Sequence, residues 1–128
     1  MPFVRISYME GKHGEERLLA AGRCILTALI EAFHIPEDDC FQVFHGHKRH
    51  EFVYSPSYLG VLRSDELLYI QITAKSGRTE EQKRRLYDRL AALLHERCGL
   101  RKEDVFVQLL ETEFADWSFG LGEAQMLR

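Results

Sequence analysis

Hydrophobic and polar residues alternate over residues 3–8, close to the start of the chain. A period of two is typical of a strand with one face better buried than the other. Over residues 15–33 the apolar positions instead recur every three or four residues, which predicts an amphipathic helix. Pro36 ends the helical segment, because the residue before a proline is disfavoured in the helical region. A second strand is expected at about residues 40–45.

The same pattern returns 65 residues later, with a strand at residues 66–73, a helix at 79–98 and a strand at 105–111. Thr79-x-x-Gln82 is a capping-box pattern at the start of the helix, and Gly99 is a typical helix stop. Several residues are identical between the copies: Glu15-Glu16 and Glu80-Glu81, Leu29 and Leu94, Glu31 and Glu96, Asp39 and Asp104, Phe41 and Phe106. The chain therefore contains an internal repeat.

Each copy of the repeat is a β-α-β unit, whose two strands are parallel because a helix crosses over between them. A pseudo-twofold arrangement makes the first strands of the two copies antiparallel neighbours. The predicted fold is α+β (α/β): a tandem β-α-β repeat forming a four-stranded mixed sheet with two helices on one face. We expect a single domain over residues 1–128, with halves at about 2–46 and 66–111 and a C-terminal segment at 112–128.

The segment between the copies, residues 47–65, contains Pro56 and Gly60 and is expected to be a connector with room for a short hairpin strand. In the predicted fold the second face of the sheet has no helix. Apolar residues on that face need cover from other subunits. The sequence therefore predicts an obligate oligomer.

Composition narrows the choice of partners. Seventeen Lys+Arg against twenty Asp+Glu give a net charge of −3, which argues against a nucleic-acid partner. No apolar run approaches the roughly 20 residues of a membrane span, and the N-terminus does not resemble a leader, so we expect a cytoplasmic protein without a membrane partner. Cys24, Cys40 and Cys98 are an odd number without Cys-x-x-Cys spacing, and are interpreted as buried or half-buried free thiols.

The topology brings three residues that can carry chemistry to one edge of the sheet. The start of one first strand lies beside the end of the other, so Pro2, Asp39 and Arg78 are expected to converge. The equivalent positions at the opposite edge are Leu67, Asp104 and His13. Because that edge has neither a proline nor an arginine, the sequence predicts that only one edge of each chain contains a functional site.

Pro2 follows the initiator methionine, whose removal exposes a secondary amine. A terminal amine titrates at about 7.7 to 8.0 in model peptides, so it exchanges protons near neutral pH. Arg78 can hold a carboxylate by two parallel hydrogen bonds, and Asp39 can orient the amine or a water molecule. The alternatives are a proline opening an edge strand, a solvated arginine and a structural turn aspartate, and the last is favoured by the equivalent Asp104.

Two further motifs are candidates for function. His45, His47 and His50 could ligate a metal, although a polar strand end is the better interpretation, and we predict no metal and no cofactor. Trp117 and Phe119 lie among polar residues and glycines after the last strand. They are expected to cover a subunit interface or to wall a pocket.

The residues together resemble a known family. Pro2, the 65-residue duplication, the string Gly77-Arg78-Thr79-Glu80-Glu81-Gln82-Lys83 and the tail Asp116-Trp117-Ser118-Phe119-Gly120 look like the tautomerase superfamily, and within it the malonate semialdehyde decarboxylase group. The resemblance implies a homotrimer and an N-terminal proline that acts as acid or base. By the same resemblance Pro2, Asp39 and Arg78 are the catalytic residues.

One departure from that group concerns the second pocket cation. Where the decarboxylase group has its first arginine this chain has Ser76, and the neighbouring Lys75 is expected to point to the other face of the strand. We expect Arg78, Ser76, Trp117 and Phe119 to contact the substrate.

The expected function is keto–enol tautomerisation of a small 2- or 3-oxo acid, with decarboxylation or hydration left open. The alternatives are a malonate semialdehyde decarboxylase proper and a non-enzymatic oligomer that retains the fold.

Overall fold

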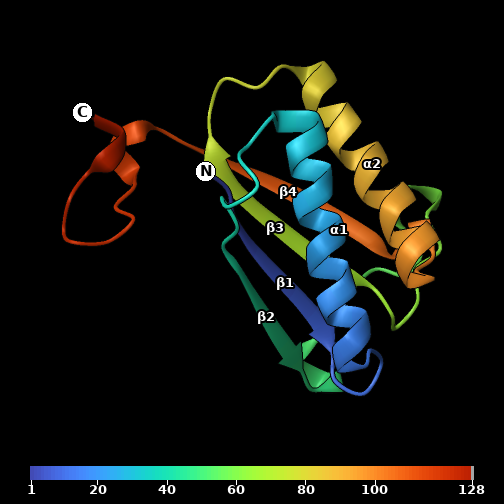
Figure 1. Ribbon diagram of the computed structural model, residues 1–128. Helices are drawn as coiled ribbons and strands as arrows, with labels where there is room; N and C mark the ends of the chain where they lie inside the picture. The colour runs from blue at the N-terminus through green and yellow to red at the C-terminus, as the bar shows by residue number, and fades with distance from the viewer. Residues whose placement is uncertain (128) are drawn as a thin grey trace.

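The computed structural model describes residues 1–127. Its main elements are β1 (Phe3–Met9), α1 (Glu15–Phe33), β2 (Gln42–His47), β3 (Leu68–Lys75), α2 (Glu80–Cys98) and β4 (Val105–Thr112). The four strands form one sheet in the order β2-β1-β3-β4 (Figure 1). The pairs β1–β2 and β3–β4 are parallel, whereas β1–β3 is antiparallel. These pairings confirm the tandem β-α-β repeat.

The ends of α2 follow the capping pattern in the sequence. The hydroxyl of Thr79 accepts a hydrogen bond from the backbone N–H of Gln82 at 3.1 Å, and the side chain of Gln82 accepts one from the backbone N–H of Thr79 at 2.9 Å. The helix ends at Gly99, whose φ of 67° lies in the left-handed region that favours glycine. Helix α1 ends at His34, which adopts the same conformation.

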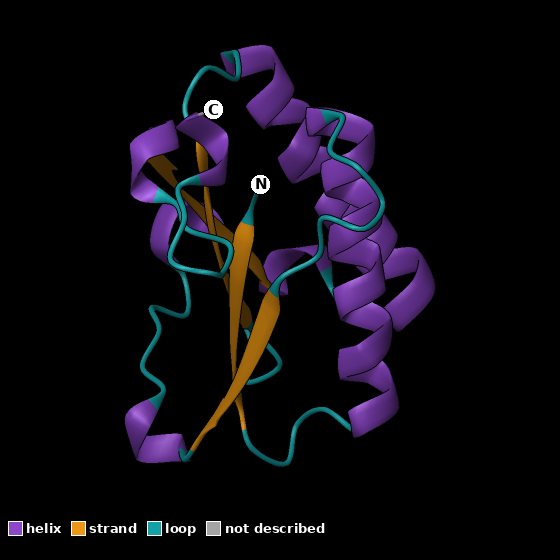
Figure 2. Cartoon of the chain, turned by 60° about the vertical axis from the view of Figure 1, so that its left-hand side comes forward, coloured by secondary structure: helices purple, strands orange, loops and turns teal. Residues whose placement is uncertain are grey.

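The hydrophobic core lies between the sheet and the two helices, which cover the same face (Figures 1 and 2). Alternate residues of the two central strands point into it, and helix residues at three- and four-residue spacing meet them. Its largest fully buried members include Ile6, Ile25, Leu29, Ile70, Ile72, Leu86, Leu90 and Leu94. The alternation and the helical spacing in the sequence thus correspond to one shared core.

The two long helices, α1 and α2, lie on one face of the sheet, and neither covers the second face (Figure 2). Phe106 and Leu110 of β4 lie there and are each 43% exposed. Polar side chains share the face, and the amide of Gln71 donates to the amide oxygen of Gln108 at 3.1 Å. Within residues 1–127, no helix is apolar and long enough to cross a membrane.

The connector differs from its prediction. Over residues 48–65 the chain forms two short 3₁₀ helices, Arg49–Glu51 and Tyr58–Gly60, and no hairpin strand. One cause is Arg63, whose guanidinium donates to the carbonyls of Ser55, Tyr58 and Val61 at 3.1 to 3.2 Å and folds the segment on itself. Carbonyls used in this way are not aligned for a strand ladder.

Two smaller expectations also need correction. The second and third strands begin two residues later than predicted, at Gln42 and Leu68. Of the three free thiols, Cys40 is exposed rather than buried or half-buried. Cys24 is buried and Cys98 is partly buried as expected, with their sulfur atoms 3.9 Å apart.

Candidate active site

The two pairings of β1 bring the predicted residues to one edge of the sheet. Phe3 lies opposite Thr73 in the antiparallel pair, so the N-terminus emerges beside the end of β3. In the parallel pair, the backbone N–H of Val4 donates to the carbonyl of Phe41 at 3.0 Å, which places the start of β2 at the same edge. The segment after β4 extends away from the sheet on the side of the N-terminus (Figure 1).

The N-terminal amine and Asp39 form an ion pair at this edge. The amine belongs to Met1, and Pro2 behind it is buried. The Asp39 side chain is only 15% exposed. A carboxylate therefore holds the start of the chain in place, one residue before Pro2.

An open cleft of about 410 Å³ lies beside this ion pair. Its lining residues come from the N-terminus, the end of β3, the first turn of α2 and the segment after β4: Met1, Lys75, Ser76, Gly77, Arg78, Gln82 and Phe114. Gly77 has a φ of 117°, a conformation that L side chains rarely adopt, and it turns the chain sharply between β3 and Arg78. The turn places Ser76 and Arg78 on the wall of one cleft.

Two contacts fix the side chain of Arg78, one with the end of β3 and one with the end of α1. One guanidinium nitrogen donates to the carbonyl of Lys75 at 2.8 Å, and the guanidinium carbon lies 4.9 Å from the centre of the Phe33 ring. Among residues 1–127 no carboxylate forms an ion pair with Arg78. The side chain is thus a positioned, uncompensated cation of the kind that binds a carboxylate ligand.

Lys75 also lines the cleft, which sequence reasoning did not predict. In the alternation of β3, Lys75 belongs to the face that α1 and α2 do not cover. Its ammonium nevertheless reaches the carbonyl of Ser76 at 3.0 Å, the hydroxyl of Ser76 at 3.3 Å and the carboxylate of Glu113 at 3.4 Å. The hydroxyl of Ser76 donates to the same carboxylate at 2.7 Å. This hydrogen bond, followed by the charge of Lys75, lowers the pKa of Glu113 below its ordinary value.

The two aromatic residues expected at the site lie apart from the cleft lining. Trp117 and Phe119 stack with ring centres 5.5 Å apart, and Phe119 also approaches Phe41 at 5.9 Å. The indole N–H of Trp117 donates to the hydroxyl of Thr112 at 2.7 Å. Phe114 lines the cleft instead. Its only signal in the sequence is an aromatic residue two positions after the last strand.

The three histidines at the second strand and its exit do not form a group of three: the rings of His45 and His47 are neighbours, 6.5 Å apart between centres, and His50 lies in the next element. The ring Nε2 of His45 lies 3.2 Å from the guanidinium of Arg5, and His47 packs near Phe52 at 6.0 Å between ring centres. His50 is exposed in the following 3₁₀ helix. No group of three or more His, Cys, Asp or Glu side chains suited to a metal is present in the described part of the chain.

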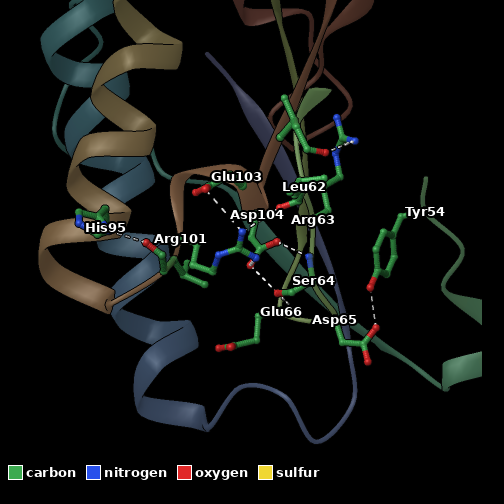
Figure 3. Close-up of polar contacts among 12 residues, drawn as sticks. Tyr54, Leu62, Arg63, Ser64, Asp65, Glu66, His95, Arg101, Glu103 and Asp104 are labelled. Atoms are coloured by element: carbon green, nitrogen blue, oxygen red, sulfur yellow. Dashed lines mark hydrogen bonds and ion pairs between the residues drawn. The ribbon is translucent and has the colours of Figure 1, made fainter. Parts of the chain in front are cut away.

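The opposite edge of the sheet contains a closed polar cluster around Asp104 (Figure 3). This carboxylate is fully buried and accepts hydrogen bonds from the backbone N–H and the hydroxyl of Ser64, at 2.7 and 2.6 Å. Arg101 lies 3.7 Å from it and also donates to the carbonyl of Leu62. Asp104 ties the connector to the start of β4, which is a structural role.

Sequence comparison identifies the family. Residues 23–120 match the family Tautomerase_2, described as "Tautomerase enzyme". Over 127 residues the chain is 47% identical to "Probable tautomerase YusQ" of Bacillus subtilis (strain 168), covering 99% of both chains. This chain belongs to the tautomerase family. A second tautomerase relative, "Probable tautomerase YrdN" of the same organism, is 36% identical over 99% of this chain and 97% of its own. Family membership supports an isomerase.

Solved structures extend the tautomerase assignment to the fold. The crystal structure of malonate semialdehyde decarboxylase, described in terms of decarboxylase and hydratase activities, superimposes with a TM-score of 0.92 at 30% identity, covering 98% of this chain and 95% of that one. Native fused 4-OT superimposes with a TM-score of 0.76 at 17% identity, over 98% of each chain, which shows the shared fold alone. The resemblance to the tautomerase superfamily stated from the sequence is confirmed.

Proposed function

We propose that this tautomerase interconverts the keto and enol forms of a small 2- or 3-oxo acid, with the nitrogen of Pro2 as acid and base. The observation that carries the proposal is the Met1–Asp39 ion pair beside a cleft in which Arg78 has no carboxylate partner among residues 1–127. A terminal amine and an uncompensated guanidinium at one cleft are the two groups that proton transfer in a carboxylic acid substrate requires.

The proposed reaction moves one proton. Arg78 holds the substrate carboxylate by paired hydrogen bonds and so fixes the adjacent carbon and oxygen at the amine. The neutral nitrogen of Pro2 takes the proton from the enol hydroxyl, and the electron pair of that O–H bond forms the C=O bond. The electron pair of the C=C bond then takes the proton from the protonated nitrogen and forms the new C–H bond. Asp39 pairs with the amine of Met1 in this structure, and after removal of Met1 it would orient the amine of Pro2. No cofactor enters this scheme.

Decarboxylation of a 3-oxo acid is the second candidate, because the similarity to malonate semialdehyde decarboxylase extends over 98% of this chain at 30% identity. In that reaction protonated Pro2 would polarise the 3-oxo group. The C–C bond to the carboxylate would break, carbon dioxide would leave, and the electron pair of that bond would pass to the remaining carbon. The same cleft and the same Arg78 would serve both reactions. Phenylenolpyruvate and malonate semialdehyde, tested side by side, separate them.

The experiment that tests the proposal is removal of the secondary amine. Purified protein should have the mass of a chain that begins at Pro2. Pro2→Ala should lower ketonisation of phenylenolpyruvate about 10²- to 10⁴-fold, which is the contribution of a positioned acid–base group, with little change in the free energy of unfolding. Full activity of a chain that retains Met1, or parental activity of the variant on every oxo acid tried, would overturn the role of Pro2. A parent protein that turns over none of the oxo acids would favour the non-enzymatic alternative.

We also propose that the chain functions as a homotrimer. The proposal is supported by the uncovered sheet face with its half-exposed Phe106 and Leu110, and by the symmetric and asymmetric trimers described for fused 4-OT, which shares the fold. Light scattering should give about three times the 14.9 kDa chain mass. A stable monomer would contradict the proposal.

A further inference from the structure

The two side-chain cations of the cleft have different surroundings. Arg78 is held by a carbonyl and an aromatic ring and has no acidic partner among the described residues. Lys75 is 22% exposed and has an acidic partner, Glu113, which is 69% exposed. The cleft therefore contains one cation that is open to an anion and one that already holds an anion contributed by the chain.

We propose that Lys75 determines substrate specificity by binding a second carboxylate of the substrate, which takes the place of Glu113. The inference rests on the proposed function and narrows its substrate class from oxo acids in general to oxo dicarboxylic acids. Arg78 would hold one carboxylate and Lys75 the other, with the reacting carbon between them and near Pro2.

Hydrogen-bond capacity favours a carboxylate over a carbonyl at Lys75. An ammonium has three donors, and three acceptor oxygens surround this one: two from Ser76 and one from Glu113. A ligand must therefore displace an existing acceptor. A neutral carbonyl in place of Glu113 would give up an ionic contact, whereas a carboxylate replaces it in kind.

Glu113 is the contact most easily displaced. Its distance to Lys75, 3.4 Å, is the longest of the three, and exposed ion pairs contribute little to stability. It also keeps a second contact, the 2.7 Å hydrogen bond from the hydroxyl of Ser76, so it stays at the rim when the ammonium turns to a ligand. Glu113 thus acts as a removable counter-ion.

The cleft has the charge and size that a small dianion needs. Its lining side chains include two cations and no carboxylate. A volume of about 410 Å³ lies within the range of small-molecule sites. Oxaloacetate, a 2-oxo dicarboxylic acid with an observable enol form, is therefore the matched probe, and phenylenolpyruvate is the monocarboxylate reference.

The test compares Lys75→Met with a matched control. Lys83→Met removes a lysine that pairs with Glu111 at a similar distance, 3.3 Å, but does not line the cleft. Lys75→Met should raise KM for the oxaloacetate enol by about tenfold or more, the worth of one lost charge-assisted contact, and leave kcat nearly unchanged. KM for phenylenolpyruvate should change less than about threefold by the same reasoning, and Lys83→Met should change neither.

Two further variants separate ligand binding from a structural tie. Lys75→Arg should restore much of the preference for the dicarboxylate, because it restores the charge. Glu113→Gln should lower KM for the oxaloacetate enol, since it removes the competing anion. If Lys75 only anchors the segment after β4, Lys75→Met and Glu113→Gln will change both substrates alike, and this outcome would overturn the inference.

Binding of succinate, which has no oxo group to react, distinguishes failure of the inference from failure of the proposed function. By calorimetry the parent and Pro2→Ala should bind succinate alike, and Lys75→Met should bind it about tenfold more weakly. If no substrate is turned over and this pattern holds, the inference stands and the proposed reaction fails. If succinate does not bind the parent, or binds Lys75→Met equally well, the inference fails.

Discussion

The two edges of the sheet contain repeat-related aspartates in opposite environments. Asp104 is fully buried and accepts two hydrogen bonds from Ser64, with Arg101 close by. Asp39 is partly exposed and pairs with the N-terminal amine beside the cleft of Arg78. The same position in a repeated fold is thus structural where the chain satisfies its acceptors, and at the other edge it faces a terminal amine, where we propose the chemistry.

The neighbours of the two aspartates differ in the same sense. Leu67, the counterpart of Pro2, is fully buried in a small apolar cluster with Met9 and Phe52. His13, the counterpart of Arg78, is partly buried, and burial lowers its pKa, with the charge of Arg17 as the next cause. One edge therefore disfavours a positive charge at the position where the other edge carries one.

The largest effect is expected at the edge of the sheet that contains Asp104, which we call the closed edge; the edge with Asp39 and Arg78 is the open edge. Asp104→Ala removes the acceptor of two part-buried donors, the backbone N–H and the hydroxyl of Ser64, whereas Arg101 keeps Glu103 at 3.5 Å. An unsatisfied buried donor costs about 1 to 3 kcal/mol, so for the two donors the free energy of unfolding should fall by about 2 to 5 kcal/mol. Urea denaturation at fixed protein concentration measures it.

Asp39→Ala is the matched control at the open edge. Because the carboxylate is partly exposed and its partner is a chain terminus, we expect the free energy of unfolding to fall by less than about 1 kcal/mol. Activity, rather than stability, should fall. Equal destabilisation by the two variants would show that the edges do not differ in the way described.

Most of the fold could be predicted from periodicity and the repeat, but the starts of strands could not. Alternation continues through Cys40 and Phe41, yet the ladder of β2 begins at Gln42. Strand bounds depend on which backbone groups find partners across the sheet. The third strand likewise extends to Lys75 because β4 pairs with it as far as Thr112.

The site could be predicted as far as topology determines it. Strand order alone brought the N-terminus, Asp39 and Arg78 to one edge. Alternation predicts that Lys75 points to the face of the strand opposite Ser76, which holds for its place on the strand. Its flexible stem nonetheless reaches Glu113, whose position depends on a turn after β4 that no periodicity describes.

The second prediction concerns a substitution that weakens binding of the substrate carboxylate at the open edge. Arg78→Ala removes a charge-assisted contact of about 1.5 to 3 kcal/mol, so KM for carboxylate substrates should rise roughly 10- to 150-fold, with a smaller change in kcat. Steady-state kinetics on phenylenolpyruvate measure it. Arg84→Ala, which removes an exposed arginine of α2, is the control and should change neither constant. An unchanged KM in Arg78→Ala would assign the guanidinium to packing on Phe33.

The third prediction adds a cation to the open edge. Ser76→Arg places an arginine where the resemblance implies the first arginine of the decarboxylase pattern, at a cleft-lining position. Decarboxylation of malonate semialdehyde should rise above that of the parent by roughly tenfold, the equivalent of about 1.4 kcal/mol from one added contact, and tautomerisation should be less affected. Carbon dioxide release measures the gain. Ser76→Lys should give a smaller gain, because a point charge cannot form paired hydrogen bonds.

The smallest expected effect is a pH dependence that originates at the closed edge. Because burial lowers the pKa of His13 below 6.5, the unfolded chain binds more protons than the folded chain once the pH falls to that value. The free energy of unfolding should therefore decline as the pH falls from about 7.5 to 5.5, through the unfolded pKa of about 6.5. His13→Gln removes this group and should flatten the decline. Urea denaturation of both proteins at the two pH values measures the difference. The carboxyl groups with lowered pKa, such as Glu31 and Glu113, lose their contribution only at more acidic pH, so they do not mask it. Identical slopes in the two proteins would show that protonation of His13 is not opposed by its surroundings, and that the closed edge tolerates the charge which Arg78 carries at the open one.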